Sequence, residues 1–388
     1  MADILLLTQG TWGDIFPFVR IGNDLNARGH NVTLLSNEYF TEKIIQAGFD
    51  RNAAINIELF EEWNRKRNYP DNWESRLLHM KEQIGWIYEI IARHSHAKLP
   101  VLVSHFGLHL PVQMAVDRFK LPCLTVFTAP YFMLNTAIHA EHYAEHSKVL
   151  NGLRAEVGLT PVKDWHQWIR SARCGIGLWP EWFARLETDW EINLEPVGFV
   201  SNEQPNEEKV PTEIQTFLRN GTKPVLINHG SSIPINENFF RIGVETCRAA
   251  RMRAVVVTQY ENLVRGCLGE DVMHYRFAHF PSLMPHMNAI IHAGGIGTTG
   301  NALAAGKPQL IMAMGLDGHD NGHRLCALGV AAHLPPAKWQ ISLTAETLFG
   351  LVSSQRVDER CRYIAGLFEH TSPLEKALKA IEKFIACQ

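Results

Sequence analysis

Residues 288–312 combine an apolar run, a cluster of glycines and a helix-forming stretch, an order that favours phosphate binding. His292 ends the apolar run, and an imidazole at a strand end can donate to a phosphate oxygen. The small residues that follow it are Gly295, Gly297, Thr298 and Thr299. Glycines let backbone N–H groups approach an anion, and a helix start adds the positive end of its dipole. A turn that needs glycine for steric reasons alone is the alternative interpretation.

Polar residues also follow two other predicted strands, 4–8 and 224–228. Ser231 comes after the second, and ligands of parallel sheets bind beyond the C-terminal strand ends, so Ser231 is expected to share the phosphate of the glycine turn. Asp14 comes after the first strand and before a helix expected at 17–28. A carboxylate there is a candidate general base, and its alternative role is the N-cap of that helix.

A second polar segment follows the next predicted strand. Asp317 could accept hydrogen bonds from ligand hydroxyls, whereas Asp320 and Asn321 are expected to cap the next helix, at 321–328. His319 and His323 have the i, i+4 spacing of metal ligands. No third ligand is evident in the sequence, so surface histidines are the favoured interpretation and no metal is predicted.

The composition excludes several classes of protein. With 46% hydrophobic and 20% charged residues, the chain has the make-up of a soluble globular protein. The net charge is −3 and the basic residues form no block beyond Arg65-Lys66-Arg67, so nucleic-acid binding is not indicated. Seven cysteines without a CxxC pair argue against a zinc site and a disulfide framework, and fit a reducing cytoplasm. No signal peptide or transmembrane segment is evident, so any membrane contact is expected to be peripheral.

The length of 388 residues predicts two domains. Strands and helices alternate in both halves, which favours parallel sheets with helices on both faces. We therefore predict an α/β protein with two doubly wound, Rossmann-like domains that face an interdomain cleft. The expected domains are 1–201 and 223–388, joined by a polar linker at 202–222. Whether the last helix returns to the first domain is left open.

Residues 131–195 lose the strand signal and are rich in tryptophan. This density fits either a core between helices or the lining of an apolar pocket. The tryptophans concerned are Trp165, Trp168, Trp179, Trp182 and Trp190.

Motifs at both ends of the chain resemble family-one glycosyltransferases of the GT-B fold. The donor signature of that family is similar to His292–Thr298, the following Ala-Leu-Ala-Ala-Gly-Lys-Pro run, and Asp317 with Asn321. Its first turn and second strand look like residues 10–17 and 28–32. The closest likeness is to bacterial rhamnosyltransferases of rhamnolipid synthesis, in segments 152–161 and 178–183.

The resemblance implies an inverting transfer that needs no metal and no cofactor beyond a nucleotide-sugar co-substrate. Asp14 occupies the position of the base that deprotonates an acceptor hydroxyl, which attacks the anomeric carbon as the diphosphate leaves. His292, Ser231 and the backbone N–H groups of residues 295–299 are expected to stabilise the diphosphate, where negative charge develops.

At the positions that bind the donor sugar nucleotide, the sequence matches the family at some residues and departs from it at two others. Phe277 matches the aromatic residue that stacks on the base, Ala278 adjoins it, and Asp317 matches the acidic residue that holds the sugar. Gly318 stands where the family has glutamine, and Asn301 where it has the glutamate that grips both ribose hydroxyls. Losing a bidentate acceptor weakens discrimination for ribose, so UDP- and dTDP-sugars both fit. A hexose or a 6-deoxyhexose such as rhamnose is expected.

The acceptor is expected in the N-terminal domain, lined by segments 60–90 and 131–190. Their aromatic and methionine content favours an apolar acceptor, either a lipid or a natural-product aglycone. His105, near a strand end, is expected to assist Asp14, to orient the acceptor, or to be a core or capping histidine, and His109 has the same alternatives. The residues assigned to the acceptor pocket are Trp12, His109, Phe132 and Trp168.

Two other functions share parts of this pattern. A nucleotide-sugar epimerase of GT-B fold has the same donor site but would need acid and base groups around the sugar. A non-catalytic partner of another glycosyltransferase would account for Gly318 and Asn301, whereas intact Asp14 and His292 argue against it.

Overall fold

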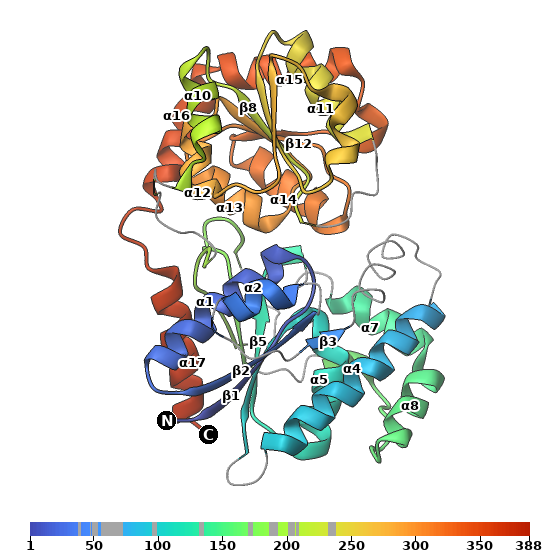
Figure 1. Ribbon diagram of the computed structural model, residues 1–388. Coiled ribbons are helices and arrows are strands. Elements are labelled where there is room, and N and C mark those ends of the chain that lie inside the picture. The colour runs from blue at the N-terminus through green and yellow to red at the C-terminus, as the bar shows by residue number, and fades with distance from the viewer. Residues whose placement is uncertain are drawn as a thin grey trace. The chain divides into compact units, whose positions relative to one another are not determined.

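The computed structural model describes residues 1–388 except 38–39, 47, 49–52, 56–72, 95–98, 132–135, 170–173, 186–192, 201–205, 207–208 and 232–237. The chain forms two compact units (Figure 1). The first comprises Met1–Val200 and Ser372–Gln388, and the second Ser201–Thr371. Each contains a parallel sheet with helices around it, so the predicted architecture of two doubly wound α/β domains is confirmed.

The sheet of the first unit has the strand order β3-β2-β1-β4-β5-β6-β7, and its pairings are parallel. The strands are β1 (Asp3–Leu7), β2 (Asn31–Asn37), β3 (Ala53–Ile55), β4 (Val101–His105), β5 (Cys123–Phe127), β6 (Cys174–Gly177) and β7 (Asn193–Pro196). The α-helices are α1 (Trp12–Ala27), α2 (Thr41–Gln46), α4 (Trp73–His94), α5 (His109–Phe119), α7 (Thr136–Glu145), α8 (Ser147–Glu156), α9 (Trp165–Ile169) and α17 (Pro373–Ala386).

The sheet of the second unit has the order β10-β9-β8-β11-β12-β13, again with parallel pairings. The strands are β8 (Val225–Asn228), β9 (Ala254–Val257), β10 (Val272–Tyr275), β11 (Ala289–His292), β12 (Gln309–Ile311) and β13 (Ala331–His333). The α-helices are α10 (Thr212–Arg219), α11 (Asn238–Ala249), α12 (Phe280–Leu283), α13 (Ile296–Ala304), α14 (Leu316–Ala327), α15 (Ile341–Ser353) and α16 (Gln355–Gly366). Helix α10 lies within the segment expected to be a linker.

Both faces of the second sheet are buried. Successive residues of a strand point to opposite faces. On β8, Val225 and Ile227 pack in a core with α11 and α15, whereas Leu226 packs in another core with α10 and α12. Burial on both faces is the reason that these strands are continuous apolar runs in the sequence instead of alternating ones.

Helix α1 begins at Trp12, earlier than predicted. The prediction used Pro17 as a first-turn residue, but the proline lies inside the helix. Thr11 is the N-cap and Asp14 occupies the third helical position, where its side chain accepts the backbone N–H of Thr11 as in a capping box. Asp14 is therefore not an N-cap residue, although it does help to cap the helix.

Among the residues matched to the donor site, one lies just beyond a strand and another in a helix whose predicted start differs. Strand β10 ends at Tyr275, so Phe277 follows it. Helix α14 begins at Leu316 with Gly315 as its N-cap, which places Asp317 in the first turn.

Asp320 and Asn321 do not cap α14, contrary to the prediction. Asp320 accepts a hydrogen bond from Arg324 at 2.9 Å, one turn later in the same helix. Asn321 is buried and donates to the backbone oxygen of Gly294 at 2.9 Å, which ties α14 to the glycine turn before α13.

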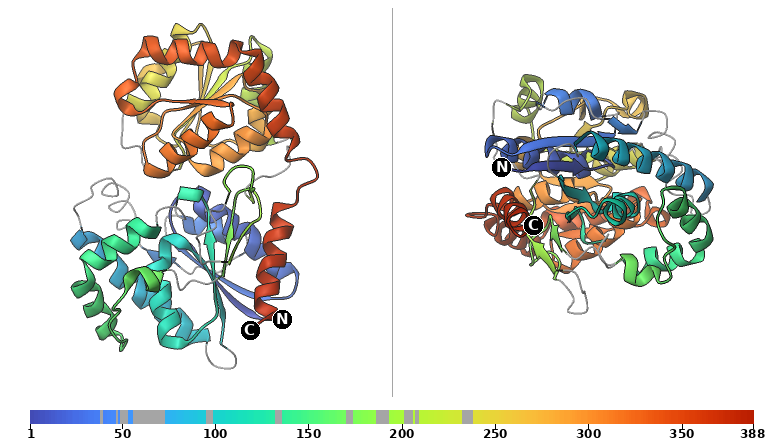
Figure 2. Two further views of the ribbon diagram at one scale, coloured as in Figure 1. Left: turned by 180° about the vertical axis from the view of Figure 1, so that it is seen from behind. Right: turned by 90° about the horizontal axis from the view of Figure 1, so that it is seen from below.

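The last helix, α17, returns to the first unit and lies beside α1 (Figures 1 and 2). Its buried side chains, Leu378 and Ile381 among them, join the same core as β1 and β4. Arg28, just after α1, forms ion pairs with Glu375 and, at 2.9 Å, with Glu382. These pairs are exposed and contribute little, so the apolar contacts of α17 carry most of its stabilisation.

Ile381→Ala should lower the free energy of unfolding of the first unit by about 2–5 kcal/mol, because Ile381 is 0% exposed and its loss leaves a cavity. Lys379→Ala on the same helix is the matched control, because that side chain is 72% exposed, and should change the value by no more than about 0.5 kcal/mol. Denaturant unfolding of wild type and the two variants measures both changes in the free energy of unfolding. Equal changes in the two variants would contradict the assignment of α17 to this core.

Candidate functional site

The strand order of each sheet reverses at one point, and predicted site residues lie at both reversals. In the first unit β1 lies between β2 and β4, with Asp14 soon after β1 and His105 at the end of β4. In the second unit β8 lies between β9 and β11, with Ser231 soon after β8 and His292 at the end of β11. Ligands of doubly wound sheets bind beyond the C-terminal strand ends at such reversals. Each unit therefore has a candidate site at its own switch point.

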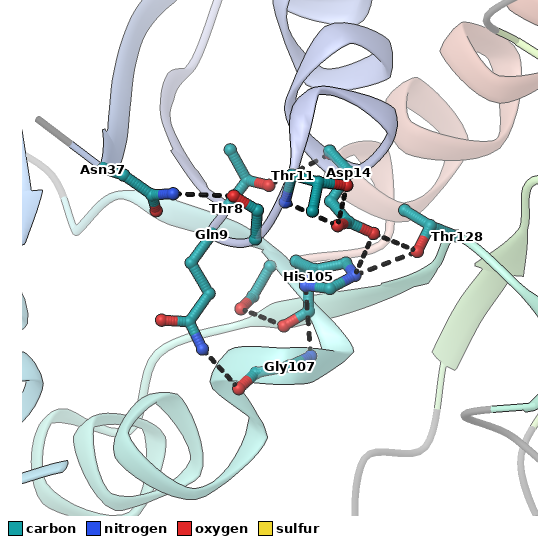
Figure 3. A network of polar contacts seen from close by, with 10 residues as sticks. Thr8, Gln9, Thr11, Asp14, Asn37, His105, Gly107 and Thr128 are labelled. Atoms are coloured by element: carbon teal, nitrogen blue, oxygen red, sulfur yellow. Dashed lines mark hydrogen bonds and ion pairs between the residues drawn. The ribbon is translucent and has the colours of Figure 1, made fainter. Parts of the chain in front are cut away.

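The carboxylate of Asp14 is held by three donors (Figure 3). Its Oδ2 accepts the backbone N–H of Thr11 at 2.9 Å and the Thr11 hydroxyl at 3.1 Å, and its Oδ1 accepts the Thr128 hydroxyl at 3.0 Å. All three hydrogen bonds stabilise a negative charge on the carboxylate. The side chain keeps 17% of its surface exposed, so a ligand can still reach it.

His105 extends this network as a neutral imidazole. Its Nδ1 accepts the backbone N–H of Gly107 at 3.2 Å, which leaves the proton on Nε2. Nε2 donates to the Thr128 hydroxyl at 3.0 Å, and that hydroxyl donates onward to Asp14. Burial lowers the pKa of His105, and the nearby charge of Asp14 reverses this shift only in part. The direction of every hydrogen bond in the chain from His105 to Asp14 is thereby assigned.

One acceptor position of Asp14 is left for a ligand. A carboxylate offers about four lone-pair sites. Among the described residues, two donors occupy Oδ2 and one occupies Oδ1. The nitrogen Nε2 of His105 is 3.6 Å from Oδ1, too far for a normal hydrogen bond. A ligand hydroxyl can therefore donate to Oδ1, and the site can accept one proton there.

Gly10 makes room for this carboxylate. Its φ is +118°, and a Cβ atom on it would lie 2.4 Å from Oδ2 of Asp14. Its backbone oxygen accepts a hydrogen bond from the buried Asn37 amide at 2.7 Å (Figure 3). Both the backbone conformation and the available space therefore require glycine before α1.

The glycine turn of the second unit leads into the N-terminus of α13. Gly294 has φ +88°, and Gly295 is the exposed N-cap residue. The predicted residues Gly297, Thr298 and Thr299 all lie in the first turns of the helix, whose leading N–H groups have no acceptor within the helix. Thr299 is buried, and its hydroxyl has no hydrogen-bond partner in the part of the chain that is described. These groups form a site suited to an anion.

The geometry contradicts the predicted donation from His292 to a phosphate. The imidazole is 1% exposed, its Nδ1 accepts the Gly294 N–H at 3.1 Å, and its Nε2 donates to Oε1 of Gln309 at 2.9 Å. Burial lowers the pKa of His292 to about 4, against a smaller opposing effect of Gln309, so the ring is neutral. Both ring nitrogens are used inside the protein, and the histidine shapes the turn instead of touching a ligand.

The two positions that depart from the family pattern have clear structural surroundings. Asn301 donates through Nδ2 to the backbone oxygen of Gly297 at 2.8 Å, and its acceptor atom Oδ1 is buried with no hydrogen-bond partner among the described residues. A Cβ atom on Gly318 would lie 2.4 Å from the backbone oxygen of Ala293, so the glycine turn excludes any side chain at this position. Asp317, beside it, is half-buried in the first turn of α14.

Phe277 and Ala278 differ in their surroundings. Phe277 is 61% exposed just beyond β10, where its ring is accessible for stacking on a planar ligand. Ala278 is 7% exposed and packs in the core beside α10 and α12, so it supports the segment without presenting a ligand surface.

Two of the predicted acceptor residues cannot line a pocket in this structure. Trp168 is 9% exposed and donates through Nε1 to Asp117 at 2.8 Å, and the same carboxylate oxygen pairs with the buried Arg154 at 2.7 Å. His109 is 6% exposed, and its ring centroid lies 5.7 Å from that of Trp168. Because both side chains are fixed in a core, the prediction for them is wrong.

The other two acceptor residues have different outcomes. Trp12 is half-buried in the first turn of α1, with its ring 5.4 Å from that of Phe16 and 5.6 Å from that of Phe40. Part of its surface is therefore accessible. Phe132 lies outside the described residues, as does much of the segment 60–90.

Sequence analysis overlooked three residues of these networks, namely Thr11, Thr128 and Gln309. Thr128 directly follows β5, the strand next to β4, so the rule that polar residues after strands form sites could have found it. Thr11 was not predicted as the N-cap, because the helix was expected to begin at residue 17 and it begins at Trp12. Gln309 opens β12 and has no local signal, because its importance comes only from its contact with His292.

A third histidine joins the pair His319 and His323. His333 of β13 shares a hydrogen bond with His319 at 2.9 Å, and its ring centroid is 4.8 Å from that of His323. Burial, with the neighbouring histidines, lowers the pKa of His333 to about 4. The three rings do not bring their nitrogens into a metal-binding arrangement among the described residues.

No helix within the described ranges is long and apolar enough to cross a bilayer.

Comparisons with known families match both units. Residues 4–114 match the Glycosyltransferase family 28 N-terminal domain, and residues 253–365 match the Erythromycin biosynthesis protein CIII-like, C-terminal domain. Glycosyltransferase GtfC of Amycolatopsis orientalis is 30% identical over 85% of each chain. O-mycaminosyltylonolide 6-deoxyallosyltransferase of Streptomyces fradiae is 26% identical over 98% of this chain and 97% of its own.

Solved structures are similar over the whole chain. The calicheamicin glycosyltransferase CalG4 has a TM-score of 0.77 at 18% identity, covering 100% of this chain and 98% of that one. Glycosyltransferase VinC, solved in complex with dTDP, has a TM-score of 0.70 at 16% identity, covering 99% and 100%.

The buried neutral His292 makes the stability of the second unit depend on pH. Its pKa is about 4 in the folded protein and about 6.5 in an unfolded chain. Between these values the unfolded chain binds a proton that the folded protein does not, so the free energy of unfolding falls as pH falls from about 6.5 to about 4. When the pH is lowered from 7 to 5, the free energy of unfolding should fall by about 2 kcal/mol less in His292→Gln than in wild type. Urea unfolding at the two pH values measures this difference.

The control for this comparison is His370→Asn, which removes an exposed histidine and tolerates the positive φ of that position. It should keep the pH dependence of the wild type. If His292→Gln also kept the pH dependence of the wild type, the buried neutral histidine would not be the source of that dependence.

Proposed function

The chain belongs to the family-one glycosyltransferases of the GT-B fold, and from this premise we propose that it transfers a hexose or 6-deoxyhexose, with inversion, from a UDP- or dTDP-sugar to a hydroxyl of an apolar acceptor. The observation that carries the proposal is the open acceptor position on Oδ1 of Asp14, at the switch point of the first sheet. The seven free cysteines fit a cytoplasmic location.

Asp14 acts as the general base in this proposal. The acceptor hydroxyl donates to Oδ1 and loses its proton there as its oxygen attacks the anomeric carbon. The bond from that carbon to the diphosphate breaks at the same time, so the configuration inverts. Thr11 fixes Oδ2, while His105 and Thr128 fix the direction of Oδ1. The proposal includes no metal, as the family resemblance implies.

The leaving diphosphate is proposed to bind at the N-terminus of α13. The free N–H groups of Gly297 and Thr298 and the buried Thr299 hydroxyl supply donors, and the helix dipole favours the negative charge. Ser231 lies at the same edge of the sheet, after β8. His292 acts indirectly, by holding the Gly294 N–H and thereby the turn.

The choice of donor is proposed to be broader than for a strict UDP-sugar enzyme. The one acceptor atom of Asn301, Oδ1, is buried, so we propose that this side chain does not hold both ribose hydroxyls as a carboxylate would. Gly318 can offer only backbone groups, which leaves Asp317 as the side chain for the sugar. The exposed Phe277 is proposed to stack on the base. One relative is named for a 6-deoxy sugar and one similar structure holds dTDP, in line with this choice.

The acceptor is proposed to be a lipid, sterol or natural-product aglycone. The half-buried Trp12, in the same first turn of α1 as Asp14, offers part of an aromatic ring to an apolar acceptor. The relatives reported above include an enzyme named for a macrolide acceptor, and a sterol 3-beta-glucosyltransferase of Arabidopsis thaliana also matches this chain. No observation favours the epimerase or the non-catalytic partner.

Asp14→Asn should lower kcat roughly 10²–10⁴-fold, because the amide cannot take the proton of the acceptor. Its remaining oxygen can still accept the Thr11 N–H, so the helix cap is retained. Product formation is followed by mass spectrometry with UDP- and dTDP-hexoses and a panel of hydroxylated apolar acceptors. Asp358→Asn, at a side chain 65% exposed, is the control and should behave as wild type. Undiminished transfer by Asp14→Asn would rule out the base assignment.

Thr128→Val should lower kcat about tenfold or more, because it removes one donor to Asp14 and leaves the buried Nε2–H of His105 without its acceptor. Thr128→Ser keeps the hydroxyl and should restore most of the activity. Steady-state kinetics of the two variants separate this positioning role from a change in packing, since equal losses in both would indicate packing alone.

A further inference from the structure

A group of potential metal ligands lies at the end of α7, an element that carries none of the residues of the two candidate sites. His142, Glu145 and His146 form the pattern His-x-x-Glu-His, in which the first and last residues are one helical turn apart. One potential ligand atom from each lies within 4.8 Å of the other two. Among the described residues no other such group of three is found.

The hydrogen bond of His146 shows which of its nitrogens faces a metal. Its Nδ1 is 2.9 Å from the backbone oxygen of His142, which can only accept, so Nδ1 carries the proton. The lone pair of His146 is therefore on Nε2. Metal-binding histidines are commonly held in this way, with the second nitrogen donating to a backbone oxygen.

The other two ligand atoms are close to the spacing that a metal requires. Nδ1 of His142 is 3.7 Å from Oε2 of Glu145. Two ligands at about 2.1 Å from a tetrahedral zinc ion are about 3.4 Å apart, so only a small side-chain movement is needed. The side chains of His142 and Glu145 are 29% and 71% exposed, which gives an ion access from solvent.

We propose that His142 Nδ1, Glu145 Oε2 and His146 Nε2 bind a Zn²⁺ ion. Two imidazoles and one carboxylate suit this ion, whereas Mg²⁺ and Ca²⁺ prefer oxygen ligands. The three protein ligands leave a fourth position for water. His146 lies between α7 and α8, so the ion ties the last turn of α7 to the start of α8. The site goes beyond the proposed transfer and takes no part in it.

The histidines on α14 provide an internal comparison. His319 and His323 have the same i, i+4 spacing, and Nδ1 of His319 shares a hydrogen bond with Nε2 of His333. Their nitrogens fail to gather as those of α7 do. The proposal therefore assigns zinc to one histidine pair and not to the other, although the sequence spacing is identical.

The test is a calorimetric titration of the chelator-treated protein, free of any histidine tag, with ZnCl₂ alone. Wild type should bind one zinc ion, and His142→Ala with His146→Ala should lose this binding. Glu145→Gln should bind more weakly but still measurably, since both imidazoles remain. The matched control, His319→Ala with His323→Ala, should bind like wild type, and circular dichroism checks that each variant is folded.

Three results would overturn the proposal: no binding by folded wild type, unchanged binding by the α7 double variant, or loss of binding in the α14 control. Replacing Zn²⁺ by Co²⁺ adds an independent readout, because a site with nitrogen and oxygen ligands gives visible absorption bands that the α7 variant should lack. Chelator treatment should leave sugar transfer unchanged, which separates this site from the proposed catalytic one.

Discussion

The hydrogen bond from the backbone N–H of Thr11 to the carboxylate of Asp14 is the interaction on which the first site depends. It satisfies one of the open N–H groups at the start of α1, and it also fixes one oxygen of the carboxylate. The second oxygen then points at Thr128, with one acceptor position left. The same contact thus starts a helix and orients the carboxylate, and the glycine with positive φ that precedes it leaves room for this carboxylate.

A buried histidine at a strand end has the same local geometry in both units. His105 ends β4 and His292 ends β11, and each strand is next to the one at which its sheet reverses. In each case Nδ1 accepts the N–H of the residue two positions later, and Nε2 donates to a buried polar side chain, Thr128 or Gln309. Burial lowers the pKa of both histidines, so neither competes with a ligand for a proton at neutral pH. These rings position the backbone around a site instead of reacting in it.

The fold and the general place of both sites could be predicted from the sequence, because they follow from local patterns. Apolar runs followed by glycine or polar residues mark strand ends, and parallel topology collects those ends at one edge. Asp14, Ser231 and residues 295–299 were placed after strand ends in this way, and the structure has them there.

The predictions that were wrong depend on contacts between residues that are distant in the sequence. Pro17 was expected to start a helix, but the capping contact of Asp14 sets the start earlier. Trp168 was assigned to a pocket, because the local sequence does not show that its Nε1–H donates to Asp117 of another helix. Nε2 of His292 donates to Gln309, and the backbone oxygen of Ala293 leaves no room for a side chain at Gly318. Both contacts arise only when β11, β12 and α14 come together.

The chemistry proposed for the second unit combines an anion site at α13 with an Asn301 side chain that does not hold both ribose hydroxyls. Calorimetric titration of the unmodified protein with UDP, dTDP, GDP and ADP tests this proposal. We expect UDP and dTDP to bind at one site with similar affinity and, in thermal unfolding, to raise the melting temperature as their concentration increases. Failure of every nucleoside diphosphate to bind would contradict it.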